Sequence, residues 1–596
     1  MQAVPAADGG EGPVARQPEA RYDLMLIKET RRLHTDRLWN AQQTRIQALG
    51  KARAMQGSCG LVGKCCLLLL LFCLSAGAAV RVPALFADGM VVQREMRIPV
   101  WGWATPGERV SVTLGERQAN AITNPDGAWM VRLEPLPAGG PHTLTVSGSN
   151  TITIRDVLVG EVWVCSGQSW MGWEVNRVRD AQQETANANF PQIRMFNTRI
   201  ATSPTPLRDC EGKWAVCSPQ TVGAFSGCGY FFARDLHQKL KVPVGMIHSS
   251  VPGTVAQAWT DRESFKDSPT LSMEMGDPDN WCYGSNPQNK AMVLYNGMIA
   301  PLIPYGIKGV IWFQGTGGEP LKAMIRGWRR NWGQGDPSTG SGQAFPFLFV
   351  QLPNYNGGSN APQGTDLAAI REAQATALAL PNTAMAVTID IGDPTDLHPI
   401  NMQDFGQRLA LIAEGTVYGQ NVVYSGPVYD HLAAEGAGLR LHFRSQDGKL
   451  AVRGNGPVEG FFLAGPNERY VPANAAIDGL TVVVSHPSVL KPTYVRYAWM
   501  NSPVCNLCNG AGLPARPFRA YVPGDGRAYA LDRITHAFTN PGFEESDPNT
   551  TNAAGWVPAN GAMRTDEKAS AGRWSMRLSG PAAVAQNGIV PVSPAP

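Results

Sequence analysis

The sequence predicts an α/β protein in which a parallel sheet, covered by helices on both faces, is flanked by β-rich segments. First, apolar strand-like runs alternate with helix-like segments between residues 156 and 424. Second, the segments on either side carry short strands separated by turn residues. Third, 64 Gly and 46 Pro residues are typical of a loop-rich chain, and 596 residues allow about four domain-sized units.

The middle segment, residues 156–424, is predicted to form the main domain. Its strand-like runs are Val157–Val164, Val244–Ile247, Gly309–Phe313, Phe345–Leu352 and Ala384–Ile391. Its helical candidates are Gly229–Leu240, Ala291–Ile299, Leu321–Trp332 and Asp366–Leu380. Because active sites of parallel sheets collect at the carboxyl ends of the strands, we expect functional residues to follow these runs.

Two β-rich segments flank the middle one. Residues 79–155 contain runs such as Arg109–Leu114, with the turn Asn124–Gly127 between strands. Residues 425–523 contain runs such as Leu439–Phe443. Each pattern predicts a β-sandwich.

The N-terminal part carries an export signal at an unusual position. Residues 1–54 are polar, and residues 55–78 combine Lys64, the apolar run Cys65–Leu74 and a small-residue site. This pattern predicts a signal peptide and a secreted or lysosomal, extracytoplasmic protein. The apolar run is short for a membrane span of about 20 residues, so we expect no stable membrane insertion.

The position of the signal has two explanations. Translation from Met55 would place it at the start and make residues 1–54 a mis-annotated extension. Alternatively, the segment is a short type II membrane anchor.

Charge and ligand-forming residues exclude several classes of function. The formal net charge is +3 and there is no long basic run, so nothing indicates a nucleic-acid partner. The nine His residues show no metal-ligand spacing, and Cys505-x-x-Cys508 has no second pair nearby. We therefore expect no metal and no cofactor.

Seven cysteines lie beyond the predicted signal: Cys165, Cys210, Cys217, Cys228, Cys282, Cys505 and Cys508. An exported chain permits disulfides, and Cys210–Cys217 is the local pair that we predict. The odd number leaves one cysteine free.

Four stretches carry the candidate chemistry: Cys165–Met171, Val251–Thr254, Trp312–Gly318 and Asp396–Pro399. Serine acyl transfer needs a nucleophile, a base, a group that orients the base, and donors to the oxyanion. A Ser after a strand, two Gly-rich turns and an Asp-x-His could supply all four. Each stretch alone is weak evidence, because such residues usually serve as caps and turns.

The four stretches in this order resemble the sialate O-acetylesterase family of the SGNH hydrolase superfamily. The resemblance runs from about residue 83 to residue 521. It includes Phe86–Gln93, Val157–Trp163, Ala256–Thr260, Leu294–Ile299, Arg371–Gln374, Val495–Trp499 and Pro517–Arg519. It implies a three-layer, flavodoxin-like α/β catalytic domain flanked by β-domains, and a carboxylesterase without a metal. The implied substrate is an O-acetylated glycan or sialic acid, typically the 9-position ester.

The resemblance also assigns residues. The family's nucleophile falls on Ser169, its base on His398 and its orienting acid on Asp396. The implied oxyanion donors are the backbone N–H groups of Ser169 and Gly253. The remaining site residues of the matching blocks are Gln168, Trp170, Gln314 and Gly315.

The matching blocks depart from the family pattern at the proposed site. Trp170 and Gly318 stand where the family has Asn, and Thr316 stands where it has Glu. Glu319 follows one place later, Pro252 replaces a usual Gly, and Met402 and Gln403 stand near the place of a usual Lys. Loss of one oxyanion donor costs comparable hydrolases about 100- to 1000-fold in rate.

Two functions remain open from these departures. The protein is an esterase with a rebuilt site, or a weakened homologue that binds acetylated glycans. A structural or adhesive β-protein is a third class, which the long α/β segment argues against.

The C-terminal segment, residues 535–596, resembles the start of a jelly-roll carbohydrate-binding module. The resemblance rests on Asn540–Glu545, Gly555-Trp556 and Ala571–Leu578. It would favour a plant or microbial polysaccharide as substrate over sialic acid, while a disordered extension is the alternative.

Overall fold

The structure is a computed structural model that describes residues 79–333, 344–355 and 366–522, with short strands at 527–529, 562–565 and 575–578. These residues belong to one compact unit, Ala78–Pro596. The predicted extension and signal peptide lie outside the described residues, as does most of the C-terminal segment. Within the part of the chain that is described, no helix has the length and apolar character needed to span a bilayer.

The core of the molecule is a large mixed sheet of eleven strands. Its central strands are β7 (Thr151–Gly167), β8 (Phe190–Thr198), β9 (Gly212–Cys217), β10 (Val244–Ser250), β11 (Gly309–Phe313), β12 (Phe347–Val350) and β13 (Thr383–Ala386). They lie in the order β13-β12-β11-β7-β10-β8-β9, and all except β9 are parallel to their neighbours. Numbered along the chain, the six parallel strands β7, β8, β10, β11, β12 and β13 lie in the order 2-3-1-4-5-6, and the predicted α/β class is confirmed.

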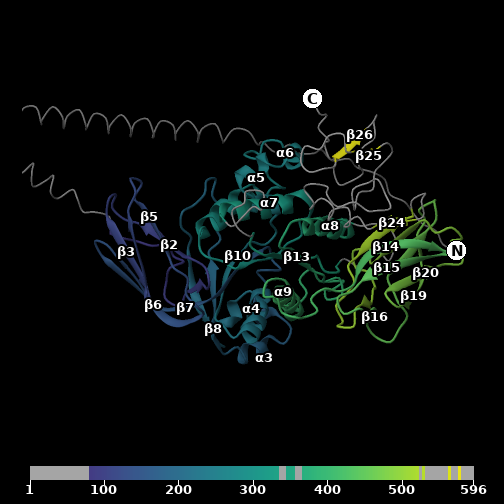
Figure 1. The fold of residues 1–596 in the computed structure, drawn as a ribbon, viewed down its shortest axis with the longest axis horizontal. Coiled ribbons are helices and arrows are strands. Elements are labelled where there is room, and N and C mark those ends of the chain that lie inside the picture. The colour runs from purple at the N-terminus through teal and green to yellow at the C-terminus, as the bar shows by residue number, and fades with distance from the viewer. Residues whose placement is uncertain are drawn as a thin grey trace, which may run out of the picture. The chain divides into compact units, whose positions relative to one another are not determined.

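Helices cover both faces of this sheet (Figure 1). The longer helices are α4 (Gly227–Leu240), α7 (Gly318–Asn331), α8 (Asp366–Ala375) and α9 (Met402–Thr416), and the shorter ones are α3 (Ala181–Ala186), α5 (Arg262–Lys266) and α6 (Pro269–Met275). Side chains alternate along each strand, so Val164 packs with α7 in one core and Cys165 packs with α4 and α9 in the other.

Single turns of helix complete the connections. The 3-10 turns are Val175–Arg177, Val222–Ala224, Ala256–Trp259, Pro287–Asn289, Ala300–Leu302 and Thr376–Ala379. The predicted helix Ala291–Ile299 contains a π-helix at Tyr295–Ile299. Strand β13 ends at Ala386 rather than at Ile391, and α9 was not predicted.

The N-terminal β-rich region continues into the same sheet. Its strands are β1 (Val91–Gln93), β2 (Ile98–Trp103), β3 (Arg109–Leu114), β4 (Arg117–Ile122), β5 (Ala128–Leu133) and β6 (Gly139–Ser147). Strands β1 and β6 pair with β7, and β2 pairs with β5 in a separate two-stranded sheet. The predicted boundary between residues 155 and 156 therefore lies inside β7, whose 17 residues serve both regions.

The C-terminal β-rich region consists of antiparallel sheets. Its strands are β14 (Val428–Glu435), β15 (Gly438–Arg444), β16 (Ala451–Val452), β17 (Phe461–Ala464), β18 (Val471–Pro472), β19 (Asn474–Asp478), β20 (Thr481–Ser485), β21 (Tyr494–Tyr497), β22 (Leu507–Cys508), β23 (Phe518–Tyr521) and β24 (Arg527–Tyr529). A five-stranded sheet that contains β15 and a four-stranded sheet that contains β17 share one hydrophobic core. Strands β25 (Ala562–Thr565) and β26 (Ser575–Leu578) pair with each other.

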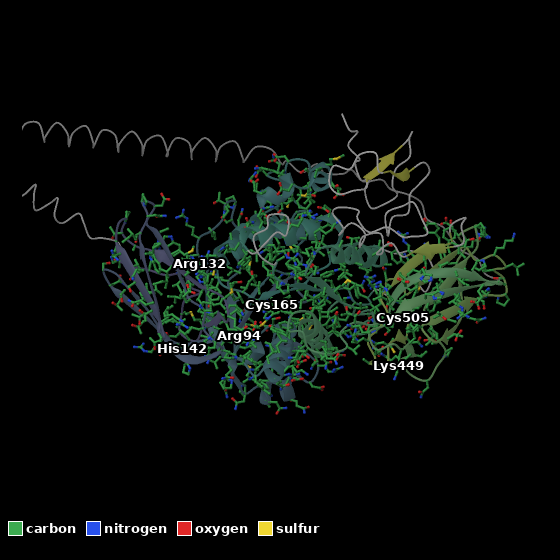
Figure 2. The ribbon with its side chains drawn as sticks, in the orientation of Figure 1. Arg94, Arg132, His142, Cys165, Lys449 and Cys505 are labelled. Carbon is green, nitrogen blue, oxygen red and sulfur yellow. The ribbon has the colours of Figure 1, made fainter. Side chains whose placement is uncertain are left out.

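The cysteines correct one prediction. All seven described cysteines are free thiols, so the predicted Cys210–Cys217 disulfide is wrong. Strand β9 alone, from Gly212 to Cys217, spans roughly 17 Å, and the two residues that join Cys210 to its start are too few to bring the thiols within disulfide reach. Cys165 lies buried within β7 (Figure 2), and burial raises the pKa of its thiol well above the usual range.

Candidate active site

The Ser169 turn, residues 167–172, begins where β7 ends. Gly167 has φ +138°, and a Cβ there would lie 2.1 Å from the carbonyl oxygen of Phe313 in neighbouring β11, so only glycine fits. The backbone N–H of Gln168 donates to that same carbonyl at 3.1 Å, and Gly172 N–H donates to the carbonyl of Gln168 at 3.0 Å. This tight turn leaves Ser169 partly exposed at the carboxyl edge of the sheet.

The sheet register brings three of the predicted stretches to one edge. Gly167 pairs with Phe313 on one side and with Ser250, the last residue of β10, on the other. The residues that follow these strand ends contain Ser169, Gln314 and Gly253. Their proximity follows directly from parallel pairing.

The fourth stretch lies on the His398 loop, residues 387–401, which connects β13 to α9. Nε2 of His398 lies 2.8 Å from Oγ of Ser169, although the two residues are 229 positions apart in the sequence. This distance is that of a nucleophile and its base. The structure therefore brings together the two residues on which the predicted chemistry depends.

Asp396 contacts the backbone of His398 rather than its ring. Its Oδ1 accepts a hydrogen bond from the His398 backbone N–H at 2.8 Å. Within the described segments, no side chain or carbonyl forms a hydrogen bond with Nδ1 of His398. The carboxylate of Asp396 thus shapes the loop and acts on the imidazole through its charge.

The pKa of His398 is set by three influences. Partial burial lowers it, the negative charge of Asp396 raises it, and the positive charge of Arg177 lowers it, so the net pKa lies below the ordinary histidine value. The imidazole is consequently neutral at neutral pH. A neutral imidazole is the form that can accept the proton of Ser169.

Trp170 connects the Ser169 turn to the His398 loop. Its indole is 5% exposed and stacks on Phe313, with ring centroids 5.3 Å apart and planes 17° apart. Its Nε1–H donates to the carbonyl oxygen of Leu397 at 2.6 Å. The one hydrogen-bond donor of the Trp170 side chain is therefore used by the loop that carries His398.

The two backbone N–H groups predicted to bind the oxyanion are unpaired. Neither Ser169 N–H nor Gly253 N–H donates to another residue that the structure describes. Gly253 adopts φ +69°, and its carbonyl oxygen accepts from Nδ2 of Asn289 at 3.0 Å. Asn289 thus fixes the turn through the carbonyl of Gly253, and the N–H of Gly253 remains available.

The stretch after β11 is organised by Gln314. This side chain is 3% exposed, and its Nε2 donates to the Thr254 carbonyl at 3.0 Å and to Oγ1 of Thr316 at 2.8 Å. Its Oε1 accepts from Thr316 N–H at 2.6 Å. Gly315 lies beside Trp170, since a Cβ there would be 3.8 Å from the indole. Gln314 therefore joins two loops of the site.

Glu319 does not replace the family residues missing at positions 316 and 318. Its carboxylate accepts from Oγ of Ser268 at 2.9 Å and forms ion pairs with Lys322 and Arg326 on α7. Burial alone would raise the pKa of Glu319, but these two cations hold it below its usual value. Glu319 is thus fully engaged by its own helix and by Ser268.

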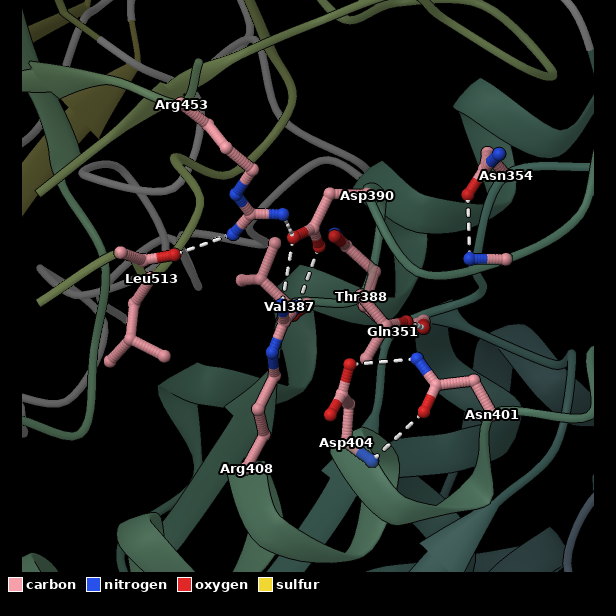
Figure 3. A network of polar contacts seen from close by, with 12 residues as sticks. Gln351, Asn354, Val387, Thr388, Asp390, Asn401, Asp404, Arg408, Arg453 and Leu513 are labelled. Carbon is pink, nitrogen blue, oxygen red and sulfur yellow. Dashed lines mark hydrogen bonds and ion pairs between the residues drawn. The ribbon is translucent and has the colours of Figure 1, made fainter. Parts of the chain in front are cut away.

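Side-chain contacts hold both ends of the His398 loop (Figure 3). At its start, Asp390 forms a bidentate ion pair with Arg408 of α9 at 2.6 and 2.7 Å and a second ion pair with Arg453. Gly392 N–H donates to Oδ1 of Asn354 at 2.8 Å. At its end, the side chain of Asn401 caps α9. Sequence reasoning missed all of these anchors.

Sequence reasoning also missed Trp173. Its indole stacks on the imidazole of His398, with ring centroids 4.8 Å apart and planes 7° apart. The segments that the structure describes contain no group of three or more His, Cys, Asp and Glu side chains placed to hold a metal ion.

Comparison with known proteins finds a family match over the segment that carries these residues. Residues 159–413, which contain all of the predicted site residues, match the family described as carbohydrate esterase, sialic acid-specific acetylesterase. Among curated relatives, mouse sialate O-acetylesterase is 28% identical over 521 residues, covering 75% of this chain and 95% of the mouse protein. Human sialate O-acetylesterase is 29% identical over 511 residues, covering 76% of this chain and 94% of the human protein.

The chain belongs to the sialate O-acetylesterase family. A crystal structure of a carbohydrate acetylesterase from Xanthomonas citri supports the same placement. That protein is 39% identical, with a TM-score of 0.68, and the match covers 74% of this chain and 99% of the other. The family resemblance predicted from the sequence is confirmed.

Proposed function

We propose that this protein is a carbohydrate O-acetylesterase that hydrolyses acetyl esters on sugars through an acyl-enzyme at Ser169. The observation that carries the proposal is the 2.8 Å contact between Ser169 Oγ and His398 Nε2 at the carboxyl edge of a parallel sheet. Family membership and the neutral His398 support it. The mainly parallel sheet, covered by helices on both faces, supports the three-layer SGNH-hydrolase fold that we propose.

In the proposed reaction, His398 takes the proton of Ser169 as the serine oxygen attacks the acetyl carbonyl carbon. The negative charge that develops on the carbonyl oxygen is stabilised by the N–H groups of Ser169 and Gly253. The C–O bond to the sugar then breaks, and His398 gives its proton to the leaving alkoxide. Water, activated by the same imidazole, releases acetate and restores Ser169.

Asp396 has a different proposed role from that of a carboxylate bonded to the ring. By accepting the backbone N–H of His398 it holds the loop, and its charge favours the imidazolium that forms during proton transfer. Trp170 holds the same loop through the Leu397 carbonyl. The two contacts fix the backbone on which the base is carried.

The substrate that we propose is an O-acetylated sugar. The mammalian relatives are named for sialate esters, whereas the Xanthomonas relative is described as a carbohydrate acetylesterase. The predicted carbohydrate-binding segment at 535–596 would favour a polysaccharide, but it lies almost wholly outside the described residues. We also propose an extracytoplasmic location, which N-terminal sequencing of the exported protein would test by finding cleavage near residue 78.

A weakened homologue that binds acetylated glycans is the second candidate. One observation favours it: Gly318 stands where the family has Asn and has no side chain to donate to the oxyanion. In that case two backbone donors would have to serve alone, and hydrolysis would be slow.

Acetate release from O-acetylated substrates tests the proposal. The substrates are 9-O-acetylated sialic acid, acetylated xylan and acetylated pectin fragments, and Ser169→Ala should reduce release to the uncatalysed level. Ser166→Ala is a matched control, because the buried Ser166 hydroxyl has no hydrogen-bond partner in the described structure. Binding of the same glycans without Ser169-dependent acetate release would establish the second candidate instead.

A further inference from the structure

The imidazole of His398 lies against an aromatic and cationic group that comes from the segment after Ser169. Its ring is nearly parallel to the indole of Trp173, with centroids 4.8 Å apart and planes 7° apart. The guanidinium carbon of Arg177 lies 3.8 Å from the centroid of the same indole. Trp173 Nε1–H donates to the Arg177 carbonyl at 3.1 Å. Trp173 therefore contacts both the proposed base and a cation.

The stack matters because the ring of His398 has few other restraints. Asp396 binds the backbone N–H of the histidine, and the described structure shows no partner for Nδ1. The contact with Ser169 alone would let the ring pivot about Nε2. A second aromatic ring, Trp170, lies at 6.4 Å and 52°, which is too far and too tilted for parallel stacking. Trp173 is thus the group that defines the plane of the imidazole.

Arg177 is placed to hold Trp173 in that position. Its guanidinium packs over the indole, and its backbone carbonyl receives the indole N–H. Arg177 lies in the single 3-10 turn Val175–Arg177 and is exposed. The guanidinium of Arg177 contacts the indole of Trp173 directly, and its positive charge lowers the pKa of His398.

We propose that Trp173 is a positioning residue that holds the imidazole of His398 in the plane required for proton transfer, and that Arg177 keeps Trp173 in place. This inference depends on the proposed role of His398 as the general base. It differs from a triad in which a carboxylate bonded to Nδ1 orients the base. An aromatic stack and a loop carboxylate share that task in this protein.

The charges around His398 shift its pKa, which can be measured. Asp396 on its own loop raises the pKa of His398, and Arg177 on the turn after Ser169 lowers it. The His398 loop also carries Asp390, which pairs with Arg408 and Arg453, and Asp393, whose carboxylate accepts from Thr395 and Asp396. Beside the turn Val175–Arg177 lie Glu174, whose carboxylate accepts from Asn176, and the ion pair of Arg179 with Asp180. All of these groups have local partners, and the charges that shift the pKa of His398 are those of Asp396 and Arg177.

Substitution of Trp173 tests the stack. Trp173→Ala should lower kcat by about 100-fold, the effect of a misplaced catalytic group, with little change in KM. Trp173→Phe keeps a flat ring and should restore most of kcat. A Trp173→Ala protein that folds and keeps wild-type kcat would overturn the inference, as would a Phe variant no better than the Ala variant.

Substitution of the two charges gives a readout that does not depend on folding defects. Arg177→Gln should move the acidic limb of the kcat/KM profile to higher pH, because the pKa of the base rises. Asp396→Asn should move it to lower pH. Arg81→Gln is the matched control, since Arg81 lies 4.7 Å over Trp103 in the N-terminal region and should leave the profile unchanged. Equal profiles for Arg177→Gln and wild type would contradict the inference.

Failure of the proposed function is distinguished by His398→Ala. Full hydrolysis by His398→Ala would refute the base assignment itself, whereas loss of hydrolysis there with full activity of Trp173→Ala would refute only the stack. If the wild-type protein proves inactive, an NMR titration of selectively labelled histidines in the full chain gives the same test. The His398 resonance should titrate at higher pH in Arg177→Gln, and no displacement would overturn the proposal.

Discussion

The Ser169 turn and the His398 loop meet at one contact but are held in different ways. The Ser169 turn, residues 167–172, continues a buried strand and is fixed by backbone hydrogen bonds to Phe313 and within itself. The His398 loop, residues 387–401, is exposed from residue 394 to residue 397 and is fixed by side chains. Backbone restraints from a central sheet tolerate little variation, whereas side-chain anchors can be exchanged one at a time.

The largest loss of stability and activity should come from a substitution in the Ser169 turn, which is fixed by backbone hydrogen bonds. Gly167→Ala combines strain at a positive φ, worth about 1–3 kcal/mol, with overpacking of about 1–3 kcal/mol against Phe313. We expect the free energy of unfolding to fall by roughly 4 kcal/mol and esterase activity to vanish. Urea unfolding and acetate release measure both.

Gly419→Ala is the matched control for Gly167→Ala. Gly419 also has a positive φ of 64°, but a Cβ there meets no atom within 4 Å. It should cost only about 1 kcal/mol and leave activity intact. Similar losses in the two variants would mean that the close approach of β11 to the Ser169 turn has no special importance.

The strongest anchor of the His398 loop should give the next largest effect. Arg408→Met removes the bidentate partner of Asp390, whose side chain is 7% exposed. Breaking a buried pair typically costs about 3–5 kcal/mol, and we expect the lower end because Arg453 remains beside Asp390. Arg440→Met is the control, since its carboxylate partners Glu435 and Asp478 are exposed and such pairs contribute about 0–1 kcal/mol.

The ion pairs of Asp390 should make the stability of the protein sensitive to acid. Burial alone would raise the pKa of Asp390, but the hydrogen bonds and charges of Arg408 and Arg453 hold it below the usual value. Its contribution to stability is therefore present above about pH 4, the unfolded value, and is lost as the pH falls through the folded pKa. Unfolding free energies of wild type and Asp390→Asn should converge on acidification, and a constant difference would contradict this origin.

Substitution of Trp170, which connects the Ser169 turn to the His398 loop, should have a smaller effect on stability. Trp170→Phe keeps the stack on Phe313 but removes the N–H that binds the Leu397 carbonyl, at a cost of about 1–3 kcal/mol. We expect kcat to fall more than stability would suggest, because the loop that carries His398 is released. Trp129→Phe is the control: Trp129 is buried, and its N–H has no partner in the described residues. Equal kcat in the two variants would show that the bridge does not position His398.

The smallest effect should come from the far end of the loop. Asn401→Ala removes the cap of α9 and should cost about 1 kcal/mol, with a modest loss of kcat. Asn124→Ala removes a comparable side-chain bond in the N-terminal region, where Oδ1 of Asn124 accepts from Ala128 N–H at 2.8 Å, and should leave kcat unchanged. If both variants retain wild-type kcat, the end of the loop plays no part in positioning the base.

The same contrast explains which features the sequence predicts. Ser169 and its turn follow an apolar run whose pattern indicates a buried strand, and family resemblance places Asp396 and His398. The anchors have no such pattern, because Asp390 meets Arg408 and Arg453 at separations of 18 and 63 residues. The bond from Trp170 to Leu397 ends on a backbone carbonyl, which carries no sequence signal.

One predicted strand ends too late, and one predicted domain boundary falls inside a strand. The apolar stretch after β13 predicts more strand, but its residues leave the sheet at Val387 to form the His398 loop, and Val387 and Ile389 pack at the core of the C-terminal β-rich region. The predicted domain boundary cut β7, because one continuous strand pairs with β6 in its first half and with β10 in its second. Local pattern does not reveal when a strand changes partners.

Labelling with a fluorophosphonate, which reacts covalently with activated serines, shows whether His398 activates Ser169. We predict that peptide mapping of the full chain finds the label on Ser169, and that His398→Ala prevents the labelling while Arg81→Gln does not. A label on another residue, or labelling of Ser169 that is unchanged in His398→Ala, would contradict it.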